Sequence, residues 1–254
     1  MTDLTTVIAY LDALLEPSRW ADYGPNGLQV PGRADIHSVV TGVSAHAELF
    51  ERAAAAGAGL VLVHHGLFWR GEPLEIDRVR RHRLGLLFEH DMALAAYHLP
   101  LDGHPEHGNN ARLAQELGAE RTEPAFAHGG APVGVVARFG ADGVAPQELL
   151  RRVRAVTERE DVLAFLDGPE QIRSLGICSG AAADDLPGAV AMGLDAFLTG
   201  EPAERCMAIA REYGIHFLAA GHHATERLGV QRLGALLEAE FGLQHEYLEI
   251  PNPI

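Results

Sequence analysis

The sequence has no apolar run approaching the roughly 18 residues that a membrane-spanning helix needs. Its first residues, MTDLTTVIAYLDALLEP, lack the basic region and cleavage pattern of a secretion signal and are typical of an amphipathic helix. Only 2 cysteines occur, Cys178 and Cys206, outside any CxxC spacing. This argues against disulfides and a thiolate zinc site, so we expect a cytoplasmic protein in a reducing compartment, with no membrane partner.

Basic residues are also scarce. There are 20 Lys and Arg against 35 Asp and Glu, which gives a formal net charge of −15. Such a balance repels nucleic acid on average, although a local basic patch stays open. The sequence also lacks a GxxxxGK[ST] phosphate loop, a GxGxxG turn opening a helix and a GxSxG nucleophile elbow. The common nucleotide-binding and serine-hydrolase classes are therefore not indicated.

What the chain has in quantity is histidine, 14 residues in 254, several of them grouped. With 47% hydrophobic residues it can bury a sizeable core, and its length suits one large or two modest domains. Grouped imidazoles are what metal sites need.

Strand and helix patterns alternate along the chain, which predicts an α/β fold with largely parallel or mixed sheets flanked by helices. We expect helices at about 5–15, 47–57, 76–89, 108–117, 146–158, 185–193, 202–213 and 223–240. We expect strands at about 38–45, 59–64, 92–99, 132–139, 162–167, 172–180, 196–199, 215–221 and 244–250. Residues 21–32 look turn-rich, and 119–132, rich in Ala, Pro and Gly, is the best linker candidate. The expected domains are 1–125 with 222–254, and 126–221.

Three predicted strands end in polar side chains. VLVHHG carries His64 and His65, YHLPLDGHPEHGNN carries His98 and Asp102, and AAGHHATER carries a third group around 222–226. In doubly wound α/β sheets, ligands bind outside the carboxyl ends of the strands. These three segments are therefore placed where a site would form.

The spacings suit metal ligands. His222 and Glu226 lie four apart at the start of a predicted helix and so share a face. His64 and His65 point to opposite faces of a strand, so they serve one site only if the chain bends at Gly66, or else they straddle a pair of ions. Imidazole and carboxylate without thiolate suit zinc, iron, manganese, nickel or cobalt, and a small ligand set leaves positions open for water.

Other residues have competing interpretations. His98 is either a metal ligand or a residue that supports a ligand. His104, His107 and His223 are expected to be bystanders or supporting residues near the site. Isolated histidines such as His37, His82 and His216 are expected on the surface or satisfied in the core. Cys178 lies in an apolar strand, which favours an inert core thiol. Trp69 and Arg70 either stack on a substrate ring and pair with an anion, or are a partly buried aromatic and a surface arginine.

Seven motifs follow one another over nearly the whole chain: GLQV, VHHGLFW, YHLPLD, GNNARLA, TGE, GHHATER and IPNP. In these motifs and their order the chain resembles the Nif-three-like dinuclear-metal-centre proteins, a group also called GTP cyclohydrolase I type 2, in its short form without an inserted domain. The resemblance implies two α/β domains in a toroidal homohexamer, with two divalent ions per subunit between the domains. The ligands it implies are His64, His65, Asp102, His222 and Glu226. The chain departs from many relatives at 22–28, DYGPNGL, which leaves the role of that loop open.

Two functions from different classes follow. In the first, the protein is a metal-dependent hydrolase acting on a nucleotide-like or other small substrate, in which paired ions activate water. Glu226 or Asp102 would bridge the ions, and His98 or His223 would move a proton, so that Glu226 and His98 are the candidate catalytic residues. No purine pocket or triphosphate cradle is visible in the sequence to support GTP itself. In the second, the chain is a non-enzymatic metal-handling or toroidal scaffold protein that binds a protein or nucleic-acid partner.

Overall fold

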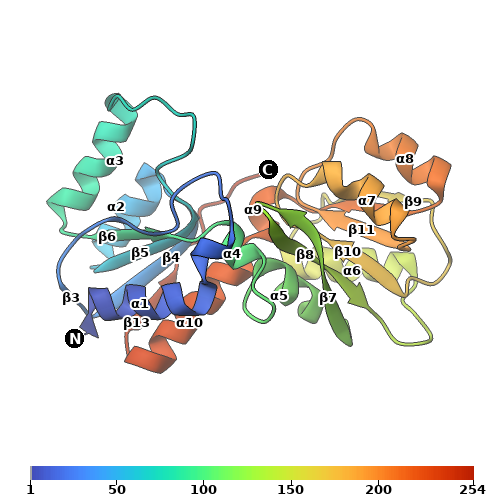
Figure 1. The fold of residues 1–254 in the computed structure, drawn as a ribbon, viewed down its shortest axis with the longest axis horizontal. Coiled ribbons are helices and arrows are strands. Elements are labelled where there is room, and N and C mark those ends of the chain that lie inside the picture. The colour runs from blue at the N-terminus through green and yellow to red at the C-terminus, as the bar shows by residue number, and fades with distance from the viewer. Residues whose placement is uncertain (1) are drawn as a thin grey trace. The chain divides into compact units, whose positions relative to one another are not determined.

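A computed structural model describes residues 2–254, which form two compact units (Figure 1). Unit 1 comprises Met1–Leu101 and Gly229–Pro251, and unit 2 comprises Asp102–Leu228 and Asn252–Ile254. Residues 102–125 contribute to unit 2 a helix that packs against β8 (Ala131–Arg138) and the start of a strand that pairs with it.

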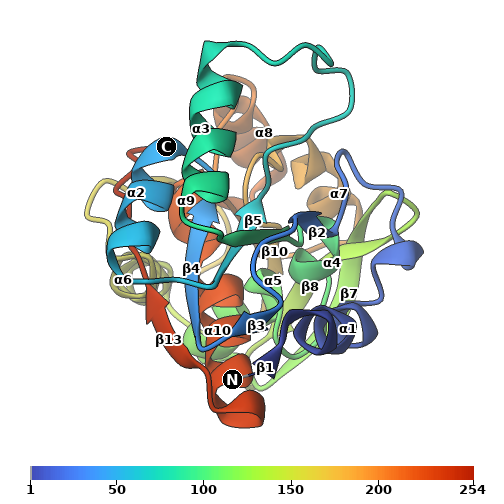
Figure 2. The ribbon, with the colours of Figure 1, turned by 90° about the vertical axis from the view of Figure 1, so that its left-hand side faces the viewer.

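Unit 1 is built on a five-stranded sheet in the order β13-β4-β5-β6-β2 (Figure 2). Four strands are parallel, and β2 pairs antiparallel with β6 at the edge. The strands are β2 (Gly27–Val30), β4 (Ser38–Ser44), β5 (Leu60–His65), β6 (Ala93–Ala96) and β13 (Gln244–Tyr247). A two-stranded ribbon, β1 (Thr2–Asp3) with β3 (Asp35–Ile36), lies apart from this sheet, and a short 3-10 turn spans Pro17–Arg19.

Helices cover both faces of the unit 1 sheet, because its strands are apolar on both sides. Leu60 and Leu62 of β5 join the core cluster of α1 (Leu4–Leu15) and α10 (Arg227–Phe241). Val61 and Val63, on the other face, join that of α2 (Ala47–Ala55) and α3 (Arg78–Glu89). Figure 2 shows these two helix pairs on opposite sides of the sheet.

Unit 2 contains a six-stranded mixed sheet in the order β7-β8-β10-β11-β12-β9. Its further strands are β7 (Arg121–His128), β9 (Leu163–Leu166), β10 (Ser174–Ile177), β11 (Ala196–Thr199) and β12 (His216–Ala219). The helices α5 (Asn109–Glu116) and α6 (Pro146–Thr157) share one core cluster, while α7 (Leu186–Ala191) and α8 (Cys206–Tyr213) pack along β11 and β12. Three short pieces complete the unit: α4 (Leu99–Asp102), which reaches it from unit 1, a 3-10 turn η2 (Ala183–Asp185), and α9 (His222–Thr225). The predicted α/β class with mixed sheets is confirmed.

The predicted linker at 119–132 is wrong. Most of it is β7, an edge strand paired antiparallel with β8 along its length. Pro124 is tolerated because an edge strand has one side without ladder bonds. Gly129 and Gly130, with φ of 59° and 89°, make the two-residue turn of this hairpin. The turn-rich stretch 21–32 likewise contains the short edge strand β2.

None of the helices in residues 2–254 is both long and apolar enough to cross a membrane.

Candidate metal centre

In unit 1, three histidines meet at the carboxyl ends of two neighbouring strands. His64 and His65 end β5, and His98 follows β6, which runs parallel to β5. The ring centroid of His64 lies 4.6 Å from that of His65 and 5.0 Å from that of His98. One ring nitrogen of each lies within 4.8 Å of the others, so these three imidazoles are a possible metal-binding group.

Hydrogen bonds fix which ring nitrogens face this group. His64 Nδ1 donates to the Tyr97 carbonyl at 3.0 Å, and His98 Nδ1 donates to Asp22 Oδ1 at 2.7 Å. In the neutral form of each ring, Nε2 is therefore the nitrogen that carries the lone pair. A metal-binding histidine usually donates its other N–H to a carboxylate or carbonyl in this way, which orients the ring and raises its basicity.

The loop 22–28, whose role the sequence left open, holds His98. Asp22 also accepts from the Leu99 backbone N–H at 2.9 Å, and Asn26 Oδ1 accepts from the His98 backbone N–H at 2.7 Å. Burial of Asp22 raises its pKa, but the hydrogen bond and charge of His98 and the Asn26 amide outweigh burial, so the pKa lies below its usual value. Asp22 is thus a carboxylate that keeps a proton on His98 Nδ1.

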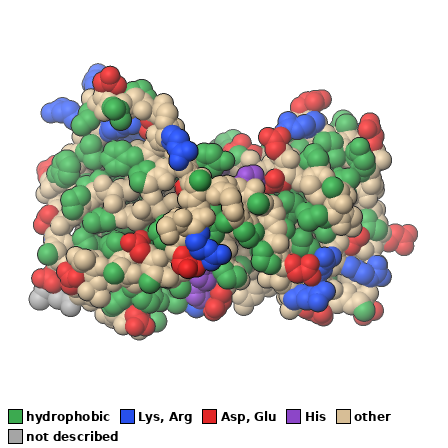
Figure 3. Space-filling view, viewed as in Figure 1, with side chains coloured by type: hydrophobic (Ala, Val, Ile, Leu, Met, Phe, Trp, Pro, Cys, Tyr) green, Lys and Arg blue, Asp and Glu red, His purple; other side chains and the backbone are tan. Residues whose placement is uncertain are grey.

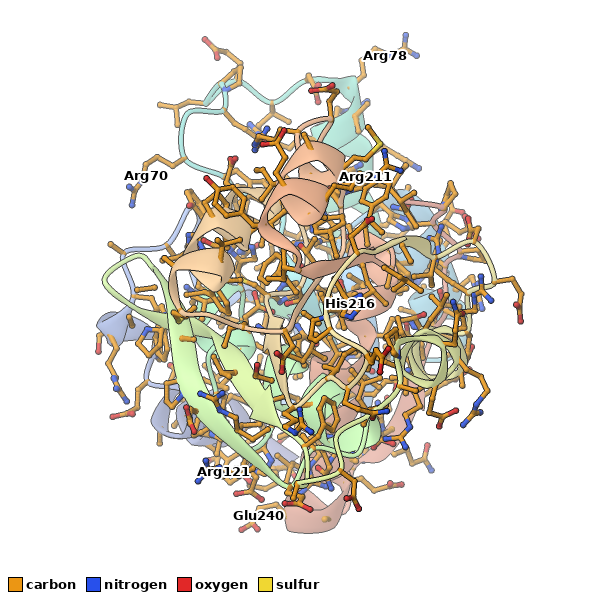
Figure 4. All side chains as sticks on the ribbon, turned by 90° about the vertical axis from the view of Figure 1, so that its right-hand side faces the viewer. Arg70, Arg78, Arg121, Arg211, His216 and Glu240 are labelled. Carbon is orange, nitrogen blue, oxygen red and sulfur yellow. The ribbon has the colours of Figure 1, made fainter. Side chains whose placement is uncertain are left out.

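Trp69 and Arg70, for which the sequence left two interpretations, lie in different surroundings. The Trp69 ring stands edge-on to His98, with centroids 5.1 Å apart, so it lines the histidine group. Arg70 donates from its guanidinium to the Asp22 carbonyl at 2.8 Å and points outward from its loop (Figure 4).

In unit 2, His222 and Glu226 come together where β12 gives way to α9. His222 Nε2 lies 3.2 Å from Glu226 Oε2, and Glu201 Oε1 accepts from His222 Nδ1 at 2.5 Å. Burial lowers the pKa of His222, but the two carboxylates raise it more, to about 9. Glu201 follows β11, the parallel neighbour of β12, so strand ends again supply the group. Glu201 was not among the predicted site residues, although the TGE motif contains it.

Asp102 and a glycine complete the polar group of unit 2. Asp102 is buried, and its Oδ1 accepts from Asn109 Nδ2 at 2.8 Å and from Ser179 Oγ at 3.1 Å. Gly180, with φ of +66°, packs directly on the Glu226 carboxylate: a Cβ there would overlap that carboxylate and lie 3.1 Å from His222 Nε2. Because glycine has no side chain, it does not fill the position beside the candidate ligand atoms of these two residues.

The other histidines make local contacts. The rings of His104 and His107 stack on each other at 4.7 Å, and His104 Nδ1 accepts from the His107 backbone N–H. His223 is buried, and its backbone N–H donates to the Ile254 carbonyl. His216, labelled in Figure 4, is satisfied in the core as expected: Nε2 donates to the Pro169 carbonyl, and Nδ1 accepts from the Gly168 N–H.

The fold and these side chains define a class, an α/β protein whose strand ends present imidazole and carboxylate groups suited to a borderline transition metal. The Duf34/NIF3 (NGG1p interacting factor 3) family pattern matches residues 2–253, and the chain belongs to this family.

Relatives and solved structures agree with this assignment. The chain is 44% identical to the GTP cyclohydrolase 1 type 2 homolog of Pseudomonas aeruginosa over 98% of both chains, and 41% identical to that of Escherichia coli over 92% of both. The solved structure of protein ybgI, itself described as of unknown function, superimposes with a TM-score of 0.92 at 38% identity over the whole of both chains. A structure of a Thermus thermophilus protein gives 0.90 at 34% identity, again over the whole of both chains.

Proposed function

We propose that the protein binds two divalent transition-metal ions through His64, His65, Asp102, His222 and Glu226, and that it hydrolyses a small substrate with them. The observation that supports this proposal most strongly is that each unit contains an imidazole whose orientation is fixed by a hydrogen bond at Nδ1. Nδ1 of His64 and of His222 is hydrogen-bonded to an oxygen, which leaves Nε2 as the ligand atom. A pattern that serves only packing has no need to bind Nδ1 to an oxygen and direct Nε2 the other way in separate places.

When bound, a pair of divalent ions lowers the pKa of water and polarises a carbonyl, amidine or phosphoryl oxygen of the substrate. The chain's own residues supply the rest. Glu226 and Asp102 are buried carboxylates, and either suits a ligand shared by both ions; hydrogen bonds from Asn109 and Ser179 hold Asp102 in one orientation.

His98 is proposed to move the proton. Its Nδ1–H stays on Asp22, so Nε2 is the atom that accepts a proton from water and returns it to the leaving group. Trp69, edge-on to His98, excludes water on one side of this ring.

The substrate class is a small molecule, and the name of the relatives, GTP cyclohydrolase 1 type 2 homolog, makes nucleotides the first group to test. On the face drawn in Figure 3, basic side chains are scattered among acidic ones, which favours a small substrate over a nucleic-acid backbone. We also propose a homohexamer working in the cytoplasm, as the family resemblance implies.

The test is a hydrolase screen. Chelator-stripped protein would be reloaded separately with Mn, Fe, Zn, Ni or Co and assayed on nucleotides, phosphoesters and amides. His98→Gln should lower turnover at least about 100-fold, in line with loss of a general acid–base group. His90→Ala, an exposed histidine in unit 1, is the matched control and should turn over normally. Metal binding with no turnover of any of these substrates would favour the metal-handling or scaffold alternative.

A further inference from the structure

We propose that unit 2 carries a second, separate metal site, in which His128, Cys178 and Asp185 bind one zinc-class divalent ion. One ligand atom from each of the three residues lies within 4.8 Å of the other two. His128 Nε2 lies 2.8 Å from Asp185 Oδ2, and the Cys178 sulfur lies within 4.8 Å of the ligand atoms of both residues. Cys178 and Asp185 lie on one segment of the chain, before and after the turn that follows β10, and His128 is brought to them from a separate hairpin.

Rigid elements hold all three. His128 is the last residue of β7 and pairs with Ala131 across the tight Gly129–Gly130 turn. Cys178 directly follows the central strand β10, and its backbone N–H donates to the Leu198 carbonyl at 3.0 Å. Asp185 ends the 3-10 turn η2. A site built on a hairpin and a central strand is more precise than one built on long loops.

The Asp185 side chain does not cap the helix that it precedes. It precedes α7, where an aspartate normally caps the helix, but it makes no side-chain capping bond. Its carboxylate instead accepts from His128. The neighbouring Asp184 behaves like an ordinary surface acid and pairs with Arg205.

In the metal-free protein, protons on Cys178 and between His128 and Asp185 occupy the positions where a cation would bind. Burial raises the pKa of the Cys178 thiol well above its usual value, and the charge of Asp185 raises it further, so the residue is a poor nucleophile. A divalent ion would take the place of the thiol proton and of the proton between His128 Nε2 and Asp185: the thiol would release one H⁺, and His128 would carry its one remaining proton on Nδ1 and offer Nε2 to the ion. Thiolate, imidazole and carboxylate together select zinc or cobalt over magnesium or calcium.

The His128–Asp185 pair needs little change to hold an ion. Ligand atoms about 2.0–2.3 Å from a tetrahedral ion are about 3.3–3.6 Å apart, so the His128–Asp185 pair opens by roughly half an ångström. The His128 side chain is 35% exposed, which gives an ion a path of entry and leaves the fourth position to water.

This site differs from the proposed dinuclear centre and does not depend on it. Cys178 and Ser179 are successive residues in different groups: the Ser179 hydroxyl donates to Asp102, whereas the Cys178 sulfur lies within 4.8 Å of ligand atoms of His128 and Asp185. The ligand sets share no residue, and only the new one contains sulfur.

Sulfur makes the test selective. Stripped full-length protein would be titrated with Co²⁺ and followed by the near-ultraviolet thiolate-to-cobalt charge-transfer band, which imidazole and carboxylate ligands do not produce. Wild type should show the band at about one ion per chain, and Cys178→Ser should lose it. Cys206→Ser, the other buried cysteine, should keep it. His128→Ala and Asp185→Asn should weaken cobalt binding in this band at least about 100-fold, because loss of a ligand exceeds the 10–100-fold effect of outer groups. Asp184→Asn should leave it unchanged.

The proposal is overturned if wild type shows no such band, if the band follows Cys206, or if His128→Ala binds as wild type does. Circular dichroism of each variant identifies one that fails to fold. If Cys178→Ser fails to fold, the cobalt titration of His128→Ala decides the test, because this side chain is 35% exposed and its loss should be tolerated. Because the readout is a cobalt–thiolate band, a failed hydrolase screen leaves this result intact, and failure here leaves the dinuclear centre intact.

Discussion

Three side chains orient the candidate metal ligands through hydrogen bonds. Asp22, Glu201 and Ser179 are the supporting residues: the first two receive an imidazole N–H, and the third donates to Asp102. Such outer groups orient the ligands and tune metal affinity, typically by about 10- to 100-fold.

Glu226→Gln should abolish binding of the ion pair while the protein stays folded. Glutamine keeps the shape but loses the charge and one carboxylate oxygen. His222 then loses a partner 3.2 Å away but keeps Glu201, so we expect a cost of about 1–3 kcal/mol, below the total stability of about 5–15 kcal/mol. Metal content and thermal melting of the stripped protein measure the two effects. Glu204→Gln, at an exposed glutamate of unit 2, is the control, and full metal content in the Glu226 variant would contradict the assignment.

Metal affinity should rise with pH because His222 must lose its proton to bind. Its pKa in the metal-free protein, about 9, lies above the ordinary 6.5, so at neutral pH the ring is charged. The apparent affinity should rise about tenfold per pH unit and level off near pH 9. The stability that the charged ring gives the stripped protein is present below pH 6.5 and lost as pH rises through 9. Calorimetry in buffers of different ionisation enthalpy should detect the released proton, and pH-independent binding between 6 and 8 would refute this.

Asp22→Asn should impair turnover without removing the metals. Asn has one oxygen where Asp22 uses two, so a donor such as the Leu99 N–H or His98 Nδ1–H loses its acceptor, at about 1–3 kcal/mol. We expect kcat to fall about 10- to 100-fold and its pH profile to shift, with metal content unchanged. Asp35→Asn, an exposed acid of unit 1, is the control. An unaltered pH profile would mean that Asp22 only supports packing.

At the scale of elements, parallel neighbours bring the polar groups together. β5 ends beside β6, and β11 beside β12, so residues far apart in sequence arrive at one sheet edge. Positive-φ glycines then turn the chain without adding a side chain. Gly180 does this against Glu226, and Gly221, with φ of 93°, opens α9.

Gly180→Ala should therefore lower metal affinity sharply. The new Cβ would overlap the Glu226 carboxylate, and φ of +66° disfavours any side chain. Gly188→Ala in α7 is the opposite case: a Cβ there meets nothing within 4 Å, and helix propensity predicts a gain of up to about 1 kcal/mol. Metal titration and denaturant unfolding of both variants test the contrast, which fails if Gly180→Ala binds metal normally.

Period-two and helical patterns in the sequence were enough to predict most elements and the mixed α/β class, because buried strands such as β5 are apolar on both faces. They failed for β7, where Pro124 and the small residues around it gave the composition of a linker. An edge strand needs neither a fully apolar face nor a complete set of N–H donors. Spacing also could not find Glu201 or Asp22, since each acts on an imidazole that arrives from another strand.

The whole molecule consists of two units, each with its own sheet and core, and each with candidate ligands at its strand ends. Neither unit alone contains all five proposed ligands. Under the proposed ligand set, we therefore expect either unit expressed alone to bind the ions much more weakly.

Assembly into six chains is the prediction at this scale. It rests on the family resemblance, since symmetry alone favours closed rings of small number. Light scattering coupled to gel filtration, at micromolar concentration and with stripped and reloaded protein, should give six times the chain mass of 27.3 kDa. A monomer across that range would refute it.

The most direct test of the dinuclear centre is metal stoichiometry in the Cys178→Ser variant, which lacks the proposed thiolate site. After reloading with excess manganese, iron or zinc and removal of free ions, elemental analysis should find two ions per chain. The same variant carrying Glu226→Gln should hold at most one. Well under one ion per chain in the variant with Glu226 intact would contradict the account.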